Sequence, residues 1–155
     1  MNVTSFELSS MSTTSLELSK RLNELGVKKM SCMAYLIFSD TEKKIKPIYR
    51  PLDPTISDLE LLASHSLGEI LEMLPTNITT QTPCGKPGVV SYVLTLIKSN
   101  FYCISYDCLG GCENCNISDN SCITFSDREN SAEPAGELLA WCIENGHVKP
   151  SDIRG

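Results

Sequence analysis

Four cysteines in one short segment carry the clearest chemical signal in this 155-residue sequence. They are Cys108, Cys112, Cys115 and Cys122, and their spacing is C-x3-C-x2-C-x6-C. The C-x2-C pair follows Gly110-Gly111, an arrangement that lets two thiolates converge on one cation. Because four thiolates suit a tetrahedral structural zinc, we expect these residues to be the candidate ligands of a single zinc ion.

Other interpretations of the cysteine segment stay open. A zinc signature with two separated C-x2-C pairs would be more specific than one pair with two outlying cysteines, and Cys103 could replace either outlier. Reduced thiols without a metal account for the same residues, and a disulfide or redox role is the third alternative. Eight cysteines in a chain without a recognisable secretion signal favour metal ligands or reduced thiols over disulfides.

No residue is predicted to be catalytic, and none is predicted to bind an organic cofactor. Acidic residues surround the cysteines in the sequence, namely Asp107, Glu113, Asp119 and Asp127. Their charge would raise the pKa of a thiol and so reduce its reactivity as a nucleophile. His65 and His147 stand at predicted helix ends, where we expect them to be solvated. The sequence has no recognisable nucleotide-binding, metalloprotease or serine-hydrolase motif, so a noncatalytic protein is favoured while an enzyme stays open.

The length and the net charge of the chain limit the number of domains and the kinds of partner that we expect. From 155 residues we expect one domain, with a mobile N-terminal tail over residues 1–13 and a single α+β domain over residues 14–155. The formal net charge of −6 disfavours binding to nucleic acid. No stretch reaches the roughly 20 apolar residues that span a bilayer, and no signal peptide is recognised, so we expect a cytoplasmic protein without a membrane partner.

Hydrophobic periodicity and turn residues predict an α+β fold in the order α-β-β-α-β-β-(β)-α. The sheet is expected to be small and antiparallel or mixed, with two longer amphipathic helices and one short helix. The longer helices are predicted at residues 15–25 and 131–145, and the short helix at residues 67–74. Strands are predicted at residues 32–38, 46–50, 89–98, 101–106 and 122–125. A helical turn is predicted at residues 59–62, and loops are predicted at residues 76–88 and 107–121.

Local patterns also predict two helix caps and two core positions. Thr14-Ser15-Leu16-Glu17 and Ser66-Leu67-Gly68-Glu69 are capping boxes, in which the first side chain accepts a backbone N–H and the glutamate reaches back. Cys32 and Cys142 lie in apolar elements, where a small buried side chain is the expected role.

Three predicted helices have sequences that stand in a familiar order. They are Ser15-Leu16-Glu17-Leu18-Ser19-Lys20-Arg21-Leu22, Leu67-Gly68-Glu69-Ile70-Leu71-Glu72-Met73-Leu74-Pro75 and Leu138-Leu139-Ala140-Trp141-Cys142-Ile143-Glu144-Asn145-Gly146. In these segments the chain resembles small uncharacterised proteins carried by bacteriophages, prophages and mobile elements. The resemblance covers most of the chain from Ser15 to Val148 and implies no activity. Such proteins usually have a shorter connection before the last helix, so the resemblance assigns no role to the cysteine segment.

These observations lead to one functional hypothesis and two alternatives. We expect a noncatalytic interaction protein, an accessory protein of a phage or mobile element in the cytoplasm of a bacterial host. It would bind a host or phage protein through an acidic surface. The first alternative is a small enzyme or a ligand-binding protein with a pocket between the sheet and the longer helices. The second is a metal or redox sensor built on the cysteine segment.

Overall fold

The structure, a computed structural model, describes residues 13–29, 31, 33–37, 48–49, 60–81, 89–108 and 121–153. The helices are α2 (Leu16–Glu24), α3 (Leu67–Met73) and α4 (Ala132–Glu144), with a final 3-10 turn, η1 (Pro150–Asp152). The strands are β1 (Met33–Ile37), β2 (Ile48–Tyr49), β3 (Glu60–Ser64), β4 (Asn77–Gln81), β5 (Val89–Lys98), β6 (Tyr102–Cys108) and β7 (Ser121–Asp127).

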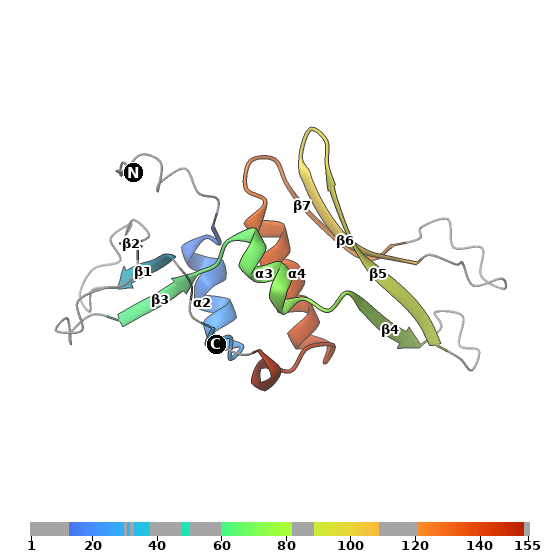
Figure 1. Cartoon of the computed structure of the whole chain (residues 1–155), viewed down its shortest axis with the longest axis horizontal. Helices are drawn as coiled ribbons and strands as arrows, with labels where there is room; N and C mark the ends of the chain where they lie inside the picture. The colour runs from blue at the N-terminus through green and yellow to red at the C-terminus, as the bar shows by residue number, and fades with distance from the viewer. Residues whose placement is uncertain are drawn as a thin grey trace.

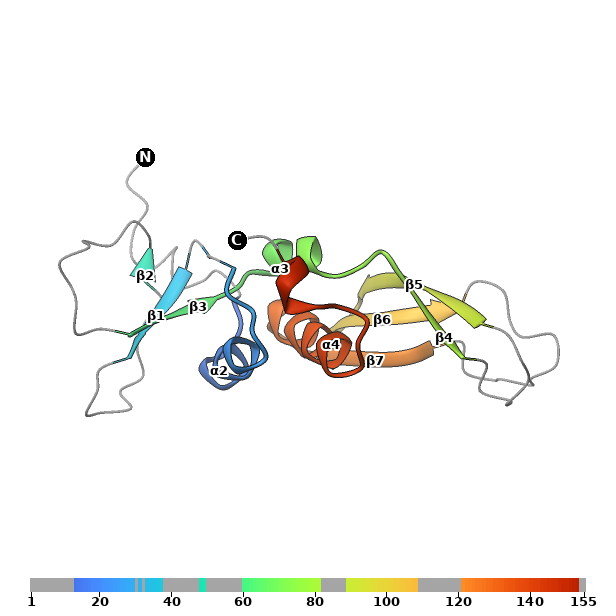
Figure 2. The same cartoon turned by 90° about the horizontal axis from the view of Figure 1, so that it is seen from below.

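The helices α2, α3 and α4 lie between two antiparallel sheets (Figure 1). The smaller sheet has the strand order β2-β1-β3, and the larger has the order β4-β5-β6-β7. In the view of Figure 2 one sheet stands at either end of the molecule, with the helices in the middle. This arrangement confirms the predicted α+β class.

A hydrophobic core fills the space between α4 and the larger sheet. Side chains alternate between the two faces of a strand, so Ile104 and Tyr106 of β6 share one face, and both are fully buried. Helix α4 contacts β6 and β7 and contributes several equally buried residues to this core. One of them is Cys142, which confirms its predicted core position. The larger sheet is therefore held by one face against α4.

The N-terminus of α2 is capped differently from the prediction. Ser15, and not Thr14, is the N-cap residue, and its hydroxyl oxygen accepts a hydrogen bond from the Leu18 N–H at 3.3 Å. Glu133 of α4 accepts hydrogen bonds from the Ser15 N–H at 2.8 Å and from the Ser15 hydroxyl at 2.6 Å. The predicted capping box is wrong because the carboxylate comes from a residue 118 positions away, which no local pattern contains.

Thr14 joins the start of α2 to the smaller sheet. Its N–H donates to the His65 carbonyl at 2.9 Å, and its side-chain oxygen accepts from the His65 N–H at 3.1 Å. The Thr14 carbonyl accepts hydrogen bonds from the hydroxyls of Tyr35 and Ser64, each at 2.9 Å. Thr14 is fully buried, so these bonds satisfy polar groups that water does not reach.

Helix α2 packs closely on α4 at Gly136. A Cβ atom at this position would lie 2.6 Å from Leu18 Cδ2 and 3.0 Å from Thr14 Cγ2. Nearer the solvent, Arg21 forms ion pairs with Glu137 at 2.7 Å and Glu144 at 2.8 Å. The missing side chain of Gly136 therefore permits the close approach, which accounts for a glycine inside a helix.

The predicted start and end of α3 are confirmed. Ser66 is its N-cap residue, and the Ser66 hydroxyl accepts a hydrogen bond from the Glu69 N–H at 3.3 Å. The Glu69 carboxylate in turn accepts from the Ser66 hydroxyl at 3.2 Å. After the helix, the Pro75 carbonyl accepts a hydrogen bond of 2.7 Å from the Tyr106 hydroxyl, which links the end of α3 to β6.

Two strands occupy segments that were predicted to have other structures. The helical turn predicted at residues 59–62 is wrong, because β3 pairs with β1 at five positions, from Met33↔Ser64 to Ile37↔Glu60. The loop predicted at residues 76–88 is wrong over β4, which pairs with β5. In both cases pairing with a strand elsewhere in the chain decides the local structure, since β-propensity depends strongly on context.

Several predictions fall outside the described residues. They concern Cys32, most of the cysteine segment and residues 1–12 of the predicted N-terminal tail. Thr13, the last residue of that tail, forms an isolated antiparallel bridge with Ser66. The predicted strand at residues 122–125 is confirmed as the centre of the longer β7.

Candidate functional site

The four candidate zinc ligands lie only partly within the described residues. Cys108 is the last residue of β6 and Cys122 the second residue of β7, whereas Cys112 and Cys115 lie outside the described residues. Because β6 and β7 are adjacent antiparallel strands, the chain leaves β6 and enters β7 at the same end of the sheet. The backbone therefore brings the two outer cysteines to one sheet end.

The pairing of β6 with β7 is irregular beside these cysteines. Tyr106 pairs with Ile123, but Asp107 pairs with Ser121. Cys122 is therefore the extra residue of a β-bulge, a feature that bends a strand locally.

Cys103 does not join this pair of cysteines. It lies five residues before Cys108 on β6, about 17 Å away at the usual rise per residue, and on the opposite face of the strand. This position disfavours the alternative in which Cys103 replaces an outlying ligand. Among the described residues, no group of three or more His, Cys, Asp or Glu side chains could hold a metal ion.

His65 is buried, so the expectation that it is solvated is wrong. Its side chain is 2% exposed, and its Nδ1 lies 3.4 Å from a Glu69 carboxylate oxygen. It follows β3 directly, and its backbone N–H and carbonyl both form hydrogen bonds with Thr14. Burial lowers the pKa of His65, and the hydrogen bond to the Glu69 carboxylate opposes this only in part.

Acid should destabilise the fold through His65. Because the pKa of His65 is lower in the folded chain than the ordinary value of about 6.5, the unfolded chain binds more protons below that pH. Stability is therefore fully present above about pH 6.5 and falls as the pH drops toward the lowered pKa, by at most about 1.4 kcal/mol per pH unit. Urea denaturation of the wild type and of His65→Gln between pH 7.5 and 5.5 measures this slope.

The slope should be smaller in His65→Gln than in the wild type. His147→Gln is the matched control, because it removes a half-buried histidine and keeps His65 in place. Equal slopes for the wild type and His65→Gln would contradict the prediction.

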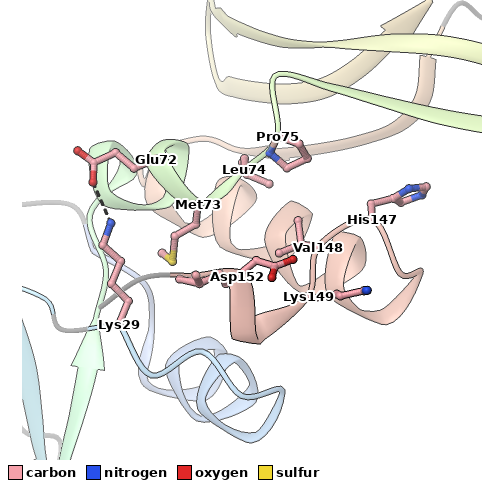
Figure 3. A pocket seen from close by; sticks show the side chains of 10 residues that line it. Lys29, Glu72, Met73, Leu74, Pro75, His147, Val148, Lys149 and Asp152 are labelled. Atoms are coloured by element: carbon pink, nitrogen blue, oxygen red, sulfur yellow. Dashed lines mark hydrogen bonds and ion pairs between the residues drawn. The ribbon is translucent and has the colours of Figure 1, made fainter.

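The groove in Figure 3 lies between the end of α3 and the C-terminal segment and has a volume of about 510 Å³. Its apolar lining comes from Met73, Leu74, Pro75, Val148 and Ile153. This position differs from the predicted pocket between the sheet and the longer helices.

Charged side chains stand at both ends of the groove (Figure 3). At one end Lys29 forms an ion pair of 2.8 Å with Glu72, and this contact lowers the pKa of Glu72. Lys149 and Asp152 also line the groove, together with His147, whose ring stacks on Trp141 at 5.1 Å. The lining contains two lysines and two carboxylates, so its charge favours neither an anionic nor a cationic ligand.

The tip of the β5–β6 hairpin exposes large apolar side chains. Among the described residues, the exposed large hydrophobic side chains are Leu96 at 43%, Ile97 at 52% and Phe101 at 45%. We call residues 96–102 the hairpin tip. In Figure 1 this end of the hairpin extends beyond α4, whereas the cysteine segment joins the other end of β6.

The hairpin tip has a single charged side chain. Residues 89–106 contain one charge, that of Lys98, although the whole chain has 32 lysine, arginine, aspartate and glutamate residues. The Lys98 ammonium lies over the Tyr102 ring, 5.2 Å from its centre. The sequence prediction recognised these strands but not their exposed tip. The sequence does contain a signal for the exposed tip. Charged residues are nearly absent from both strands and from the turn between them, although a turn is normally exposed to water.

Comparison of the chain with protein-family models, with curated proteins and with solved structures finds no match. Within the described part of the chain, no helix is both long enough and apolar enough to cross a membrane.

Proposed function

We propose that this chain is a noncatalytic interaction protein that binds a protein partner through the hairpin tip. The observation that carries the proposal is the exposure of Leu96, Ile97 and Phe101 on one projecting hairpin. Apolar surface gains about 25 cal/mol per Å² when it leaves water, and exposed apolar patches commonly mark protein contacts. A partner that covers the tip would gain this free energy.

The resemblance of the helix segments supports an accessory role in a phage or mobile element. On this proposal the chain acts in the cytoplasm of a bacterial host, and the partner is a host or phage protein. The net charge of −6 supports a protein partner over a nucleic acid.

Acidic side chains support the proposal less than the hairpin tip does. Glu133 is engaged by Ser15, and both Glu137 and Glu144 are engaged by Arg21. These internal contacts reduce the charge that α4 offers to a partner.

Substitution of the tip tests the proposal. Ile97→Ser combined with Phe101→Ser should lower the recovery of a specific partner from bacterial lysate at least about tenfold, because the side chains that the partner covers are lost. Quantitative mass spectrometry of the captured proteins measures the recovery. Thr124→Ala, on the exposed surface of β7, is the control and should recover the partner as the wild type does. The same recovery with the tip variant, or no specific partner with the wild type, would contradict the proposal.

A structural zinc in the cysteine segment is a second candidate feature, favoured by the position of Cys108 and Cys122 at one end of the sheet. With Cys112 and Cys115 as the remaining ligands, the metal would stiffen the segment as a further contact surface. Elemental analysis of untagged protein should find one zinc per chain, and Cys108→Ser should lose most of it. Cys103→Ser should retain it. Wild-type protein without zinc would rule out this candidate.

A further inference from the structure

β5 continues beyond its neighbour β4, which leaves an open strand edge. The register of β4 with β5 ends at Asn77↔Val93. One more backbone hydrogen bond follows on this side, from the Leu94 N–H to the Thr76 carbonyl at 2.9 Å. Beyond Thr76 the chain turns away toward α3, and Figure 2 shows β4 beside only one end of β5.

The open edge is formed by the backbone of Leu96 and Lys98. Alternate residues of a strand direct their N–H and C=O groups to opposite sides, so Leu96 and Lys98 point to the same side as Leu94. Thr95 and Ile97 point to β6. No described residue pairs with the Leu96 or Lys98 backbone on the β4 side.

We infer that the partner adds a strand to this edge, as an extended segment that pairs with residues 95–98 of β5. The inference rests on the proposed function and specifies the kind of partner. Leu96 pairs with Ile104 and its neighbour Ile97 with Cys103, so their side chains lie on opposite faces of β5. A flat surface can cover one of these faces, whereas an added strand places side chains on both.

The partner segment has apolar side chains on both faces and an acidic residue near Lys98. Lys98 is the only charge in residues 89–106, so an acidic residue gives charge complementarity at the tip. A second copy of this chain fits less well. Its net charge of −6 repels an identical chain, and an edge of four residues is short for a stable dimer.

Photo-crosslinking tests the inference with the partner that the capture experiment recovers. A benzophenone amino acid is placed at position 96 or 97, and at position 124 as a control. Positions 96 and 97 should label neighbouring residues of one extended segment of the partner, and position 124 should not label that segment. Labelling of unrelated partner regions, of a second copy of this chain or of lipid would overturn the inference.

The backbone contact has its own test. Leu96→Pro removes the N–H on the open edge and should weaken binding at least about tenfold more than Leu96→Ala, which keeps it. Amide hydrogen exchange on the wild-type complex keeps the test decisive if the proline variant does not fold. The Leu96 and Lys98 amides should gain protection on binding, while the Thr95 and Ile97 amides change little.

Charge reversal at Lys98 tests for the acidic residue of the partner segment, since Lys98→Glu should weaken binding about tenfold or more.

A captured partner that leaves the edge amides unprotected would overturn strand addition but keep the proposed function. Failure to capture any partner would reject the proposed function itself.

Discussion

Tyr106→Ala is expected to lower the free energy of unfolding by about 3–5 kcal/mol, because it removes the largest fully buried side chain among the described residues. The Tyr106 ring is enclosed by the core that α4 and β6 form, and its hydroxyl donates a 2.7 Å hydrogen bond to the Pro75 carbonyl. Burial raises the pKa of the phenol far above its usual range, so the hydroxyl stays protonated at neutral pH. Urea denaturation followed by circular dichroism measures the loss.

Tyr106→Phe separates the hydrogen bond from the packing of the ring. It should cost about 1–2 kcal/mol, since the Pro75 carbonyl loses its partner. Tyr102→Phe is the matched control on the same strand, because no described residue receives a hydrogen bond from that hydroxyl, and it should change stability by less than about 0.5 kcal/mol. Equal losses in the two phenylalanine variants would contradict a specific role for the Tyr106–Pro75 bond.

Gly136→Ala should destabilise the protein by about 1–2 kcal/mol, although alanine is normally the better helix former. The new methyl group would meet Leu18 Cδ2 at 2.6 Å and Thr14 Cγ2 at 3.0 Å. Leu18 is buried, and Thr14 is held by hydrogen bonds, so neither moves freely. Because the contact at 2.6 Å is so short, we expect the upper part of the usual overpacking cost, about 2–3 kcal/mol. The gain of about 1 kcal/mol from helix propensity then leaves a net loss of about 1–2 kcal/mol.

Gly68→Ala is the control with the opposite expected sign. A Cβ atom at Gly68 would meet no described atom within 4 Å beyond its chain neighbours and the backbone of its own helix, so this substitution should stabilise the protein by up to about 1 kcal/mol. Chemical denaturation of both variants under the same conditions compares the two signs. Stabilisation by Gly136→Ala would contradict the close approach of α2 to α4.

A double-mutant cycle identifies the cause of the loss. If Leu18 is crowded by the new methyl group, Leu18→Ala should cost at least about 1 kcal/mol less in the Gly136→Ala background than in the wild type. Additive losses would mean that Leu18 is not the residue that resists the substitution.

Local patterns predicted the helices better than the strands. The apolar repeat over residues 15–25 and the Ser66 cap identify α2 and α3 because helix hydrogen bonds join residues near in sequence. β3 and β4 were missed, since their backbone groups are satisfied by β1 and β5. The same reason explains the cap of α2, where Glu133 replaces the predicted Glu17.

The candidate site residues also differ in how well the sequence predicts them. Cysteine spacing is a sequence property, so Cys108 and Cys122 could be selected as candidate zinc ligands before the structure was known, and their zinc remains a proposal. The burial of His65 could not be predicted, because it arises from contacts made only in the folded chain, where Thr14, 51 positions away, lies beside it.

The sequence by itself determined the α+β class, the positions of the helices and the long β5–β6 hairpin. Each of these depends on the period of apolar residues over a few turns or on turn residues between strands. Only the tertiary structure decided that β4 stops short of the hairpin tip and that α4 does not cover it. The edge is open because β4 is shorter than β5, and the tip is exposed because the hairpin extends beyond α4. Both depend on elements that are brought together only by folding, so a local stretch of sequence does not predict them.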